Sequence, residues 1–123
     1  MRERAQQLLK EAYDRLEAEF PTHQKIVVSG LTDVGVPSIA YREAAARNWR
    51  TVGIACSKAS GYPCFPVSER IIVGSEWGEE SETFLNYIDS LIRIGGGNQA
   101  LMETAKARKM GKYVIEFNLL ALE

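Results

Sequence analysis

Two glycine-rich segments carry the residue types of this 123-residue sequence that are best suited to binding a ligand. Residues 30–35 read Gly-Leu-Thr-Asp-Val-Gly, and residues 95–100 read Gly-Gly-Gly-Asn-Gln-Ala. Glycine has no Cβ, so its backbone can approach a ligand closely and can take a positive φ without strain. Each segment lies between an apolar run and a helical pattern, and the free N–H groups at a helix start attract anions. Both segments therefore predict strand-to-helix loops that bind an anionic group.

The predicted ligand-binding residues are those that can line these two loops. They are Gly30, Thr32, Asp33, Gly35, Gly95, Gly96, Gly97, Asn98 and Gln99. Thr32 and Asn98 offer side-chain hydrogen bonds, whereas Asp33 would repel a phosphate but could hold a ribose hydroxyl or cap a helix. A tight turn alone needs glycine, so residues 30–35 leave a structural and a functional interpretation equally open. Residues 95–97 are three consecutive glycines, more than a turn alone needs. Each glycine carries an entropic cost because it makes the unfolded chain more flexible, so this segment favours ligand binding.

The elements that must position the loops follow from apolar periodicity and chain-breaking residues. Apolar residues at helical spacing predict an amphipathic helix over residues 2–20, which Pro21 ends. Apolar runs predict strands at residues 25–29, 51–56, 70–73, 91–94 and 113–117, the first two buried on both faces. The helices expected between them cover residues 37–48, 79–87, and 98 to a C-terminal cap at Gly111. This alternation predicts an α/β fold.

More specifically, we expect a three-layer, doubly wound Rossmann-like fold with about five mainly parallel strands, forming one domain over residues 1–123. The composition is globular, with 46% apolar and 25% charged residues. The net charge of −1 argues against a nucleic-acid partner, which needs a clustered basic surface. The charged start and the absence of a long apolar run predict a cytoplasmic protein that binds no membrane.

Several isolated residues admit more than one role. Cys56 and Cys64 are expected to be free thiols, and the few Cys and His residues predict no metal site. No cofactor is expected. Arg93 lies in a buried apolar run and needs a partner, which is a carboxylate such as Asp89 or Glu116, or else a ligand phosphate. Trp77 and Tyr62 either contact a ligand or seal a core or a subunit contact. The terminal Leu122 and Glu123 could be a remnant of an expression vector.

Together the two loops resemble the motifs of the LOG-like superfamily of Rossmann folds. This superfamily includes the Lonely Guy phosphoribohydrolases, often named lysine decarboxylases, the molybdenum-cofactor carrier proteins and the SLOG nucleotide-sensor domains. Val28-Ser29-Gly30, followed by Gly35-Val36-Pro37-Ser38-Ile39-Ala40, keeps the spacing of the first family motif. The segment from Gly95 to Glu103 matches the two middle glycines and the final Glu of the second motif, Pro-Gly-Gly-x-Gly-Thr-x-x-Glu, but has Gln99 in place of the third glycine and Ala100 in place of the Thr. The resemblance covers residues 25–118.

The resemblance implies a domain that binds a nucleotide or a nucleotide-derived phosphorylated ligand and that forms a homodimer or a higher homo-oligomer. It also raises a nucleoside 5′-monophosphate phosphoribohydrolase as an alternative, with Glu103 as the catalytic carboxylate. A binding role for Glu103 is favoured over that of a first-turn acid that complements the helix dipole, and both are favoured over catalysis. The family's Arg-Lys pair corresponds here to Glu79-Glu80-Ser81-Glu82, which argues against hydrolysis. A non-catalytic interaction subunit is a third alternative.

Overall fold

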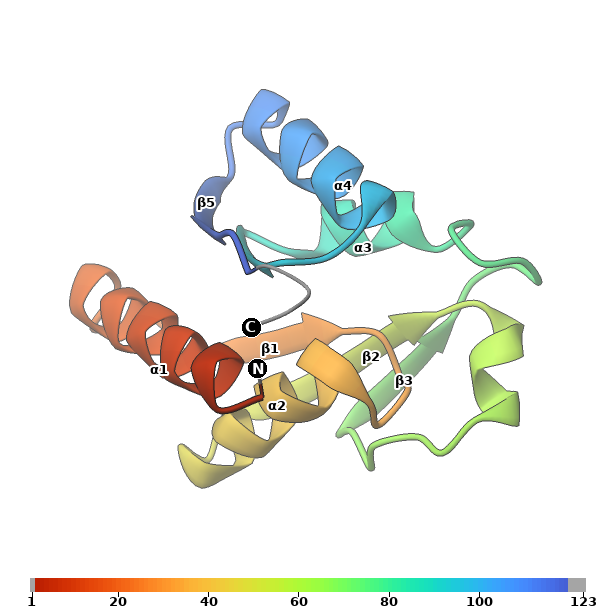
Figure 1. Ribbon diagram of the computed structural model, residues 1–123, viewed down its shortest axis with the longest axis horizontal. Helices are drawn as coiled ribbons and strands as arrows, with labels where there is room; N and C mark the ends of the chain where they lie inside the picture. The colour runs from red at the N-terminus through yellow and green to blue at the C-terminus, as the bar shows by residue number, and fades with distance from the viewer. Residues whose placement is uncertain (1, 120–123) are drawn as a thin grey trace. The chain divides into compact units, whose positions relative to one another are not determined.

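Parallel strands and the helices between them make up the part of the chain that is described, residues 2–119 of a computed structural model (Figure 1). These residues divide into two units. The central unit comprises Thr22–Asn86, and the split unit comprises the residues up to Pro21 together with those from Tyr87 onward. The expectation of a single domain over residues 1–123 stays a prediction. Leu122 and Glu123, the proposed vector remnant, lie outside the described residues.

The central unit is built on a three-stranded parallel sheet with the strand order β1–β2–β3. The strands are β1 (Ile26–Ser29), β2 (Arg50–Ala55) and β3 (Glu69–Ile72). β2 lies in the middle and is buried from its second residue onward, which confirms the prediction from its apolar run. The predicted burial of the first strand on both faces is wrong. β1 is an edge strand of this sheet, and it is half-buried apart from Ile26, which is exposed.

The helix α2 (Gly35–Ala46) packs against β1 and β2. It begins at Gly35 rather than at Pro37, because proline is tolerated anywhere in a first turn, where N–H groups have no intrahelical acceptor. Its end is fixed by Asn48, whose φ of 60° places it in the left-handed region. The next N–H, that of Trp49, donates to the Ala44 carbonyl at 2.8 Å. Asparagine therefore ends this helix in the way glycine usually does.

Two shorter helices follow the later strands of the central unit. The 3-10 helix η1 (Ser57–Gly61) follows β2 in a segment where the sequence predicts only a loop. The helix α3 (Ser81–Tyr87) follows β3 and is shorter than predicted. The acidic residues before it bond to the backbone, since Glu79 Oε1 accepts the N–H groups of Ser75 and Glu76 at 2.9 and 2.7 Å. These acids therefore stabilise the turn between β3 and α3.

The split unit pairs β4 (Ser90–Ile94) with β5 (Tyr113–Phe117) in a two-stranded parallel sheet. The helix α4 (Asn98–Lys109) connects the two strands and packs against both of them. Gly111 follows just after its end with a φ of +76°, so the predicted glycine cap is confirmed. The helix α1 (Arg2–Glu19) packs against β4 and carries an apolar stripe whose buried members are Ala5, Leu8, Leu9, Ala12 and Tyr13.

The predicted fold class and the predicted parallel direction of the strands are confirmed. The described residues have an α/β fold, and their five strands pair only in parallel within the two sheets. A single five-stranded sheet with three layers is not confirmed, because the strands form one sheet of three and another of two. An apolar run shows that a segment is a strand but does not show which strand it pairs with, since the pairing depends on distant parts of the chain.

Candidate functional site

The three consecutive glycines lie between the carboxyl end of β4 and the start of α4. Gly95 and Gly96 have φ values of +62° and +93°, which only glycine adopts readily. A Cβ on Gly96 would lie 2.7 Å from the Cβ of Ala100, and one on Gly95 would lie 3.2 Å from that of Leu119. Both positions therefore require glycine for the fold itself.

Gly97 differs from its two neighbours. Its φ is −99°, in extended backbone, and an added Cβ would meet no atom within 4 Å. It is the N-cap of α4, and no side chain caps the helix from that position. The N–H groups of the first helical turn have no acceptor within a helix, and the helix dipole gives this end a partial positive charge. The third glycine is therefore not required by the fold, and it stands beside backbone donors.

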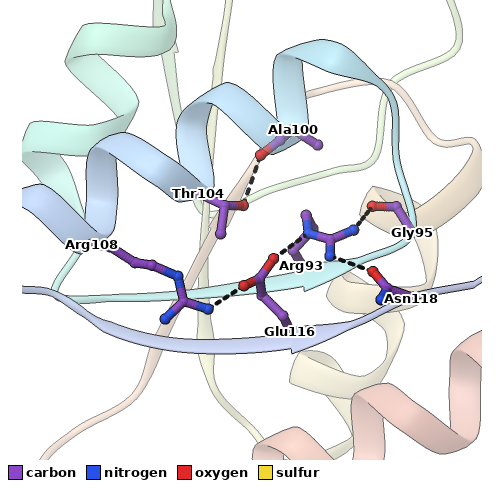
Figure 2. A network of polar contacts seen from close by, with 7 residues as sticks. All are labelled: Arg93, Gly95, Ala100, Thr104, Arg108, Glu116 and Asn118. Carbon is purple, nitrogen blue, oxygen red and sulfur yellow. Dashed lines mark hydrogen bonds and ion pairs between the residues drawn. The ribbon is translucent and has the colours of Figure 1, made fainter.

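The buried Arg93 connects this loop to β5 (Figure 2). Its side chain is 8% exposed, and its Nη1 donates to the Gly95 carbonyl at 2.7 Å. Its Nε donates to Glu116 Oε2 at 2.8 Å, and its Nη2 donates to Asn118 Oδ1 at 2.7 Å. The structure thus identifies Glu116, and not Asp89, as the predicted carboxylate partner. One guanidinium fixes the first residue of the glycine loop against the end of β5.

Glu116 accepts hydrogen bonds from two arginines. Arg108, near the end of α4, donates to Oε1, while Arg93 donates to Oε2. Hydrogen bonds from Arg108 first, and then from Arg93, lower the pKa of the Glu116 carboxyl. Arg108 of α4 and Arg93 of β4 thus both bind Glu116 of β5, which ties these three elements together. One turn before Arg108, the Thr104 hydroxyl donates to the Ala100 carbonyl at 2.7 Å within α4 (Figure 2).

The predicted residues that follow the three glycines lie at the solvent-exposed start of α4. Asn98 and Gln99 are exposed, and Glu103 is half-buried one turn further along the helix. Gln99 Nε2 donates to Glu103 Oε2 at 3.4 Å. The structure therefore places Glu103 one helical turn from the loop, in contact with Gln99. Its proposed catalytic role stays a prediction.

The first glycine loop, residues 30–35, is anchored within the central unit. Leu31 is 1% exposed and packs with Ala55 and Ala59. The N–H of Asp33 donates to the Pro63 carbonyl at 2.8 Å, and the N–H of Phe65 donates to the Leu31 carbonyl at 3.0 Å. Residues on both sides of Thr32 are thus held against the segment that follows η1, and the loop has a defined shape without a ligand.

A charged pair lies on this loop. Arg42 Nη2 is 3.2 Å from Asp33 Oδ2, and Arg42 Nε donates to Ser38 Oγ at 3.2 Å. The Asp33 side chain does not cap α2, because the N-cap is Val34 and no side-chain capping bond is present there. The sequence interpretation missed Arg42. No sequence signal pointed to it, because its pairing with Asp33 is a tertiary contact.

The two glycine loops belong to different units. The structure brings the residues around Gly95 together at the start of α4, and it pairs Asp33 of the first loop with Arg42 of α2. Thr32 forms an isolated antiparallel bridge with Cys64. That both loops bind one ligand stays a prediction. Among residues 2–119, no group of three or more His, Cys, Asp or Glu side chains could hold a metal ion. Cys56 and Cys64 are free thiols, as predicted.

The fold and the loop geometry define an α/β protein with glycine-rich loops after parallel strands. Comparisons with models of protein families, with curated proteins and with solved structures find no match. The resemblance to the LOG-like superfamily therefore rests on the two sequence motifs. None of the helices within residues 2–119 is both long enough and apolar enough to cross a membrane.

Proposed function

We propose that this chain is a small-ligand-binding domain that recognises a nucleotide or a nucleotide-derived phosphorylated ligand through its two glycine-rich strand-to-helix loops. The observation that supports this most is the environment of Gly97. Neither its backbone conformation nor its packing requires glycine, although glycine is entropically costly where another residue would fit. Gly30, which follows β1, resembles Gly97 in this respect: it has no positive φ, and an added Cβ would meet no atom within 4 Å. Close approach of a ligand to the backbone accounts for both.

The chemistry of the α4 start favours an anionic ligand group. Because the N-cap is a glycine, it has no side chain that could cap the first turn of the helix. A phosphate oxygen accepts hydrogen bonds from the N–H groups at a helix start and is attracted by the positive end of the helix dipole. Arg93 holds the Gly95 carbonyl from the other side, so the loop keeps its shape before a ligand arrives. These features together make a phosphate the ligand group that this loop suits best.

The finer fold prediction is part of this proposal. In it, the five strands belong to one doubly wound, three-layer Rossmann-like sheet, and both loops bind the same ligand. Ligands of such folds bind beyond the carboxyl ends of the strands, and each loop does follow the carboxyl end of its own strand. The proposal also includes a cytoplasmic location and self-association as a homodimer or a higher homo-oligomer.

A thermal-shift screen with the Gly97→Asp and Gly97→Asn variants tests the proposal. Adenosine, guanosine, cytidine and uridine monophosphates are each added to the wild-type chain. A ligand at a hundredfold excess over Kd stabilises the folded state by about 2.7 kcal/mol, which raises Tm by several degrees. Both variants have favoured N-cap residues, so their Tm without ligand should not fall. Asp adds a negative charge at the proposed phosphate site and should abolish the ligand shift, while the uncharged Asn should retain more of it.

The control for this experiment is Gln24→Asp. Gln24 is exposed and precedes β1, so it lies at the opposite end of that strand from residues 30–35. This variant adds the same negative charge away from that loop and should keep the ligand shift of the wild type. The proposal is wrong if no nucleotide raises Tm, or if Gly97→Asp retains the full shift.

A further inference from the structure

Two large aromatic side chains lie exposed and in contact with each other in the central unit. Tyr62 is 56% exposed and Trp77 is 50% exposed. Their ring centroids are 5.9 Å apart, and the ring planes are tilted by 57°. Aromatic rings are among the largest apolar groups that a core can bury, yet neither of these fills the core of this unit. Their role therefore lies at the surface.

Both rings follow the carboxyl ends of parallel strands. Tyr62 comes directly after η1, which follows β2, and Trp77 lies in the turn that follows β3. This is the edge of a parallel sheet at which ligands bind. Pro63, the next residue after Tyr62, accepts the N–H of Asp33 at 2.8 Å. The aromatic pair therefore adjoins the first glycine loop, residues 30–35, within the same unit.

Polar contacts fix the two loops that carry the rings. The N–H of Ser57 donates to the Gly74 carbonyl at 3.0 Å, which joins one loop to the other. Lys58 Nζ is 2.5 Å from Glu76 Oε2, which joins them a second time. Glu79 Oε1 accepts the N–H of Glu76 at 2.7 Å. Loops that are already ordered lose little conformational freedom when a ligand binds, so the pair is preorganised.

We propose that Tyr62 and Trp77 form a stacking site for the aromatic base of the ligand, an inference that rests on the proposed nucleotide-binding function. Every nucleobase has a flat π-face that stacks on aromatic side chains. Lys58, which lies on the same loops, is already paired with Glu76. The two aromatic rings are therefore the groups of this surface that we expect to contact a ligand. The site thus distinguishes a complete nucleotide from its sugar phosphate.

Comparing adenosine monophosphate with ribose 5-phosphate, which lacks the base, tests this inference. In the Trp49→Phe variant, Trp77 is the remaining one of the chain's two tryptophans and reports on stacking by its fluorescence. Adenosine monophosphate should quench it, and ribose 5-phosphate should not. Tyr62→Leu and Trp77→Leu should each weaken adenosine monophosphate binding by roughly 5- to 150-fold, the range for one base stacked on an aromatic ring. Neither should change the affinity for ribose 5-phosphate.

Two further variants separate stacking from general damage. Tyr62→Phe keeps the ring and should keep the wild-type affinity. Tyr87→Leu removes another exposed tyrosine, 41% exposed at the end of α3, and should also bind normally. Circular dichroism and Tm show whether each variant is folded.

The outcomes keep the two proposals apart. Unchanged binding of adenosine monophosphate in both leucine variants, or an unquenched Trp77 at saturation, overturns the stacking site. If the nucleotide and ribose 5-phosphate bind with equal affinity, stacking is wrong while the proposed function stands. If neither compound binds, and the other three nucleoside monophosphates also fail, both proposals are wrong.

Discussion

At the scale of single residues, Glu116 is the carboxylate that holds the network under the second glycine loop. It accepts from Arg93, which donates in turn to the Gly95 carbonyl, and from Arg108 on α4. Losing the negative charge of Glu116 would leave the cationic Arg93 buried without its counter-ion. Protonation of one side chain therefore acts on the backbone of the loop.

We predict that Glu116 makes the stability of the chain depend on acidic pH. The hydrogen bonds from its two arginines lower its pKa, while a glutamate in an unfolded chain has a pKa of about 4.3. Its contribution is therefore complete above the unfolded pKa and is lost as the pH falls through the lower, folded pKa. Urea unfolding at several pH values between about 5 and about 3 should show a shallower loss of stability in Glu116→Gln than in the wild type.

The matched control is Glu11→Gln, which removes one carboxylate from the exposed side of α1. This variant should follow the wild-type pH profile. Parallel profiles of Glu116→Gln and the wild type would show that the arginine contacts of Glu116 contribute nothing to this dependence.

The sequence predicted part of this residue-level arrangement. A buried arginine must have a partner, so Glu116 could be named beforehand as one of two candidates for Arg93. Asn118 and Arg42 could not be named, because an exposed polar residue gives no signal of what it contacts. The difference between Gly97 and the two glycines before it was also hidden, since it depends on backbone angles and on neighbouring atoms.

At the scale of elements, Tyr41 joins the helix α2 to the sheet beneath it. Its side chain is fully buried, and its hydroxyl lies 2.7 Å from the Gly30 carbonyl and 3.0 Å from the Val52 carbonyl. Its ring stacks on Phe65 with centroids 5.1 Å apart. Burial raises the pKa of the Tyr41 hydroxyl, so this group stays a protonated donor. The first glycine loop is thereby fixed from α2.

Tyr41→Phe should lower the free energy of unfolding by about 1–3 kcal/mol. The Gly30 and Val52 carbonyls lose the hydroxyl donor at a buried position, while the packing of the ring remains. Chemical denaturation measures this difference. Tyr87→Phe removes the hydroxyl of an exposed tyrosine and should have no comparable effect. Equal stabilities of the two variants would mean that water replaces the Tyr41 hydroxyl at no cost.

The elements themselves were predicted unevenly. The predicted residues of β5 match the observed strand, and the start of α4 and its glycine cap were also correct, because apolar runs and glycine mark them directly. The burial of β1 was wrong, since its apolar residues do not reveal that it is an edge strand. The helix η1 was missed because Gly61, its last residue, and the prolines after it indicated a loop.

At the scale of the whole molecule, the two units differ in how the chain forms them. The central unit is one continuous segment, whereas the split unit combines α1 with a second segment that begins near the end of α3. Each unit has its own sheet. We therefore expect the two units to open as separate cooperative units in hydrogen exchange.

Leu9→Ala tests this expectation. Leu9 is 2% exposed on α1, and truncating a buried leucine costs about 2–5 kcal/mol. Amide exchange should accelerate in β4 and β5, which share the unit with α1, and much less in β2. Leu101→Ala truncates a leucine of α4 that is 49% exposed and should leave both units protected. Equal acceleration in β2 would show that the whole chain opens as one unit.

The division of the split unit along the chain has a consequence for synthesis on the ribosome. α1 ends at Glu19 and β4 begins at Ser90, so about 70 residues separate the helix from the strand it packs on. At about 5–20 residues per second, translation takes roughly 4–14 s to cross that interval, while the central unit emerges and can already fold. Throughout this delay the apolar stripe of α1 has no strand to cover it. It is then open to a chaperone, or to the same helix of a neighbouring nascent chain.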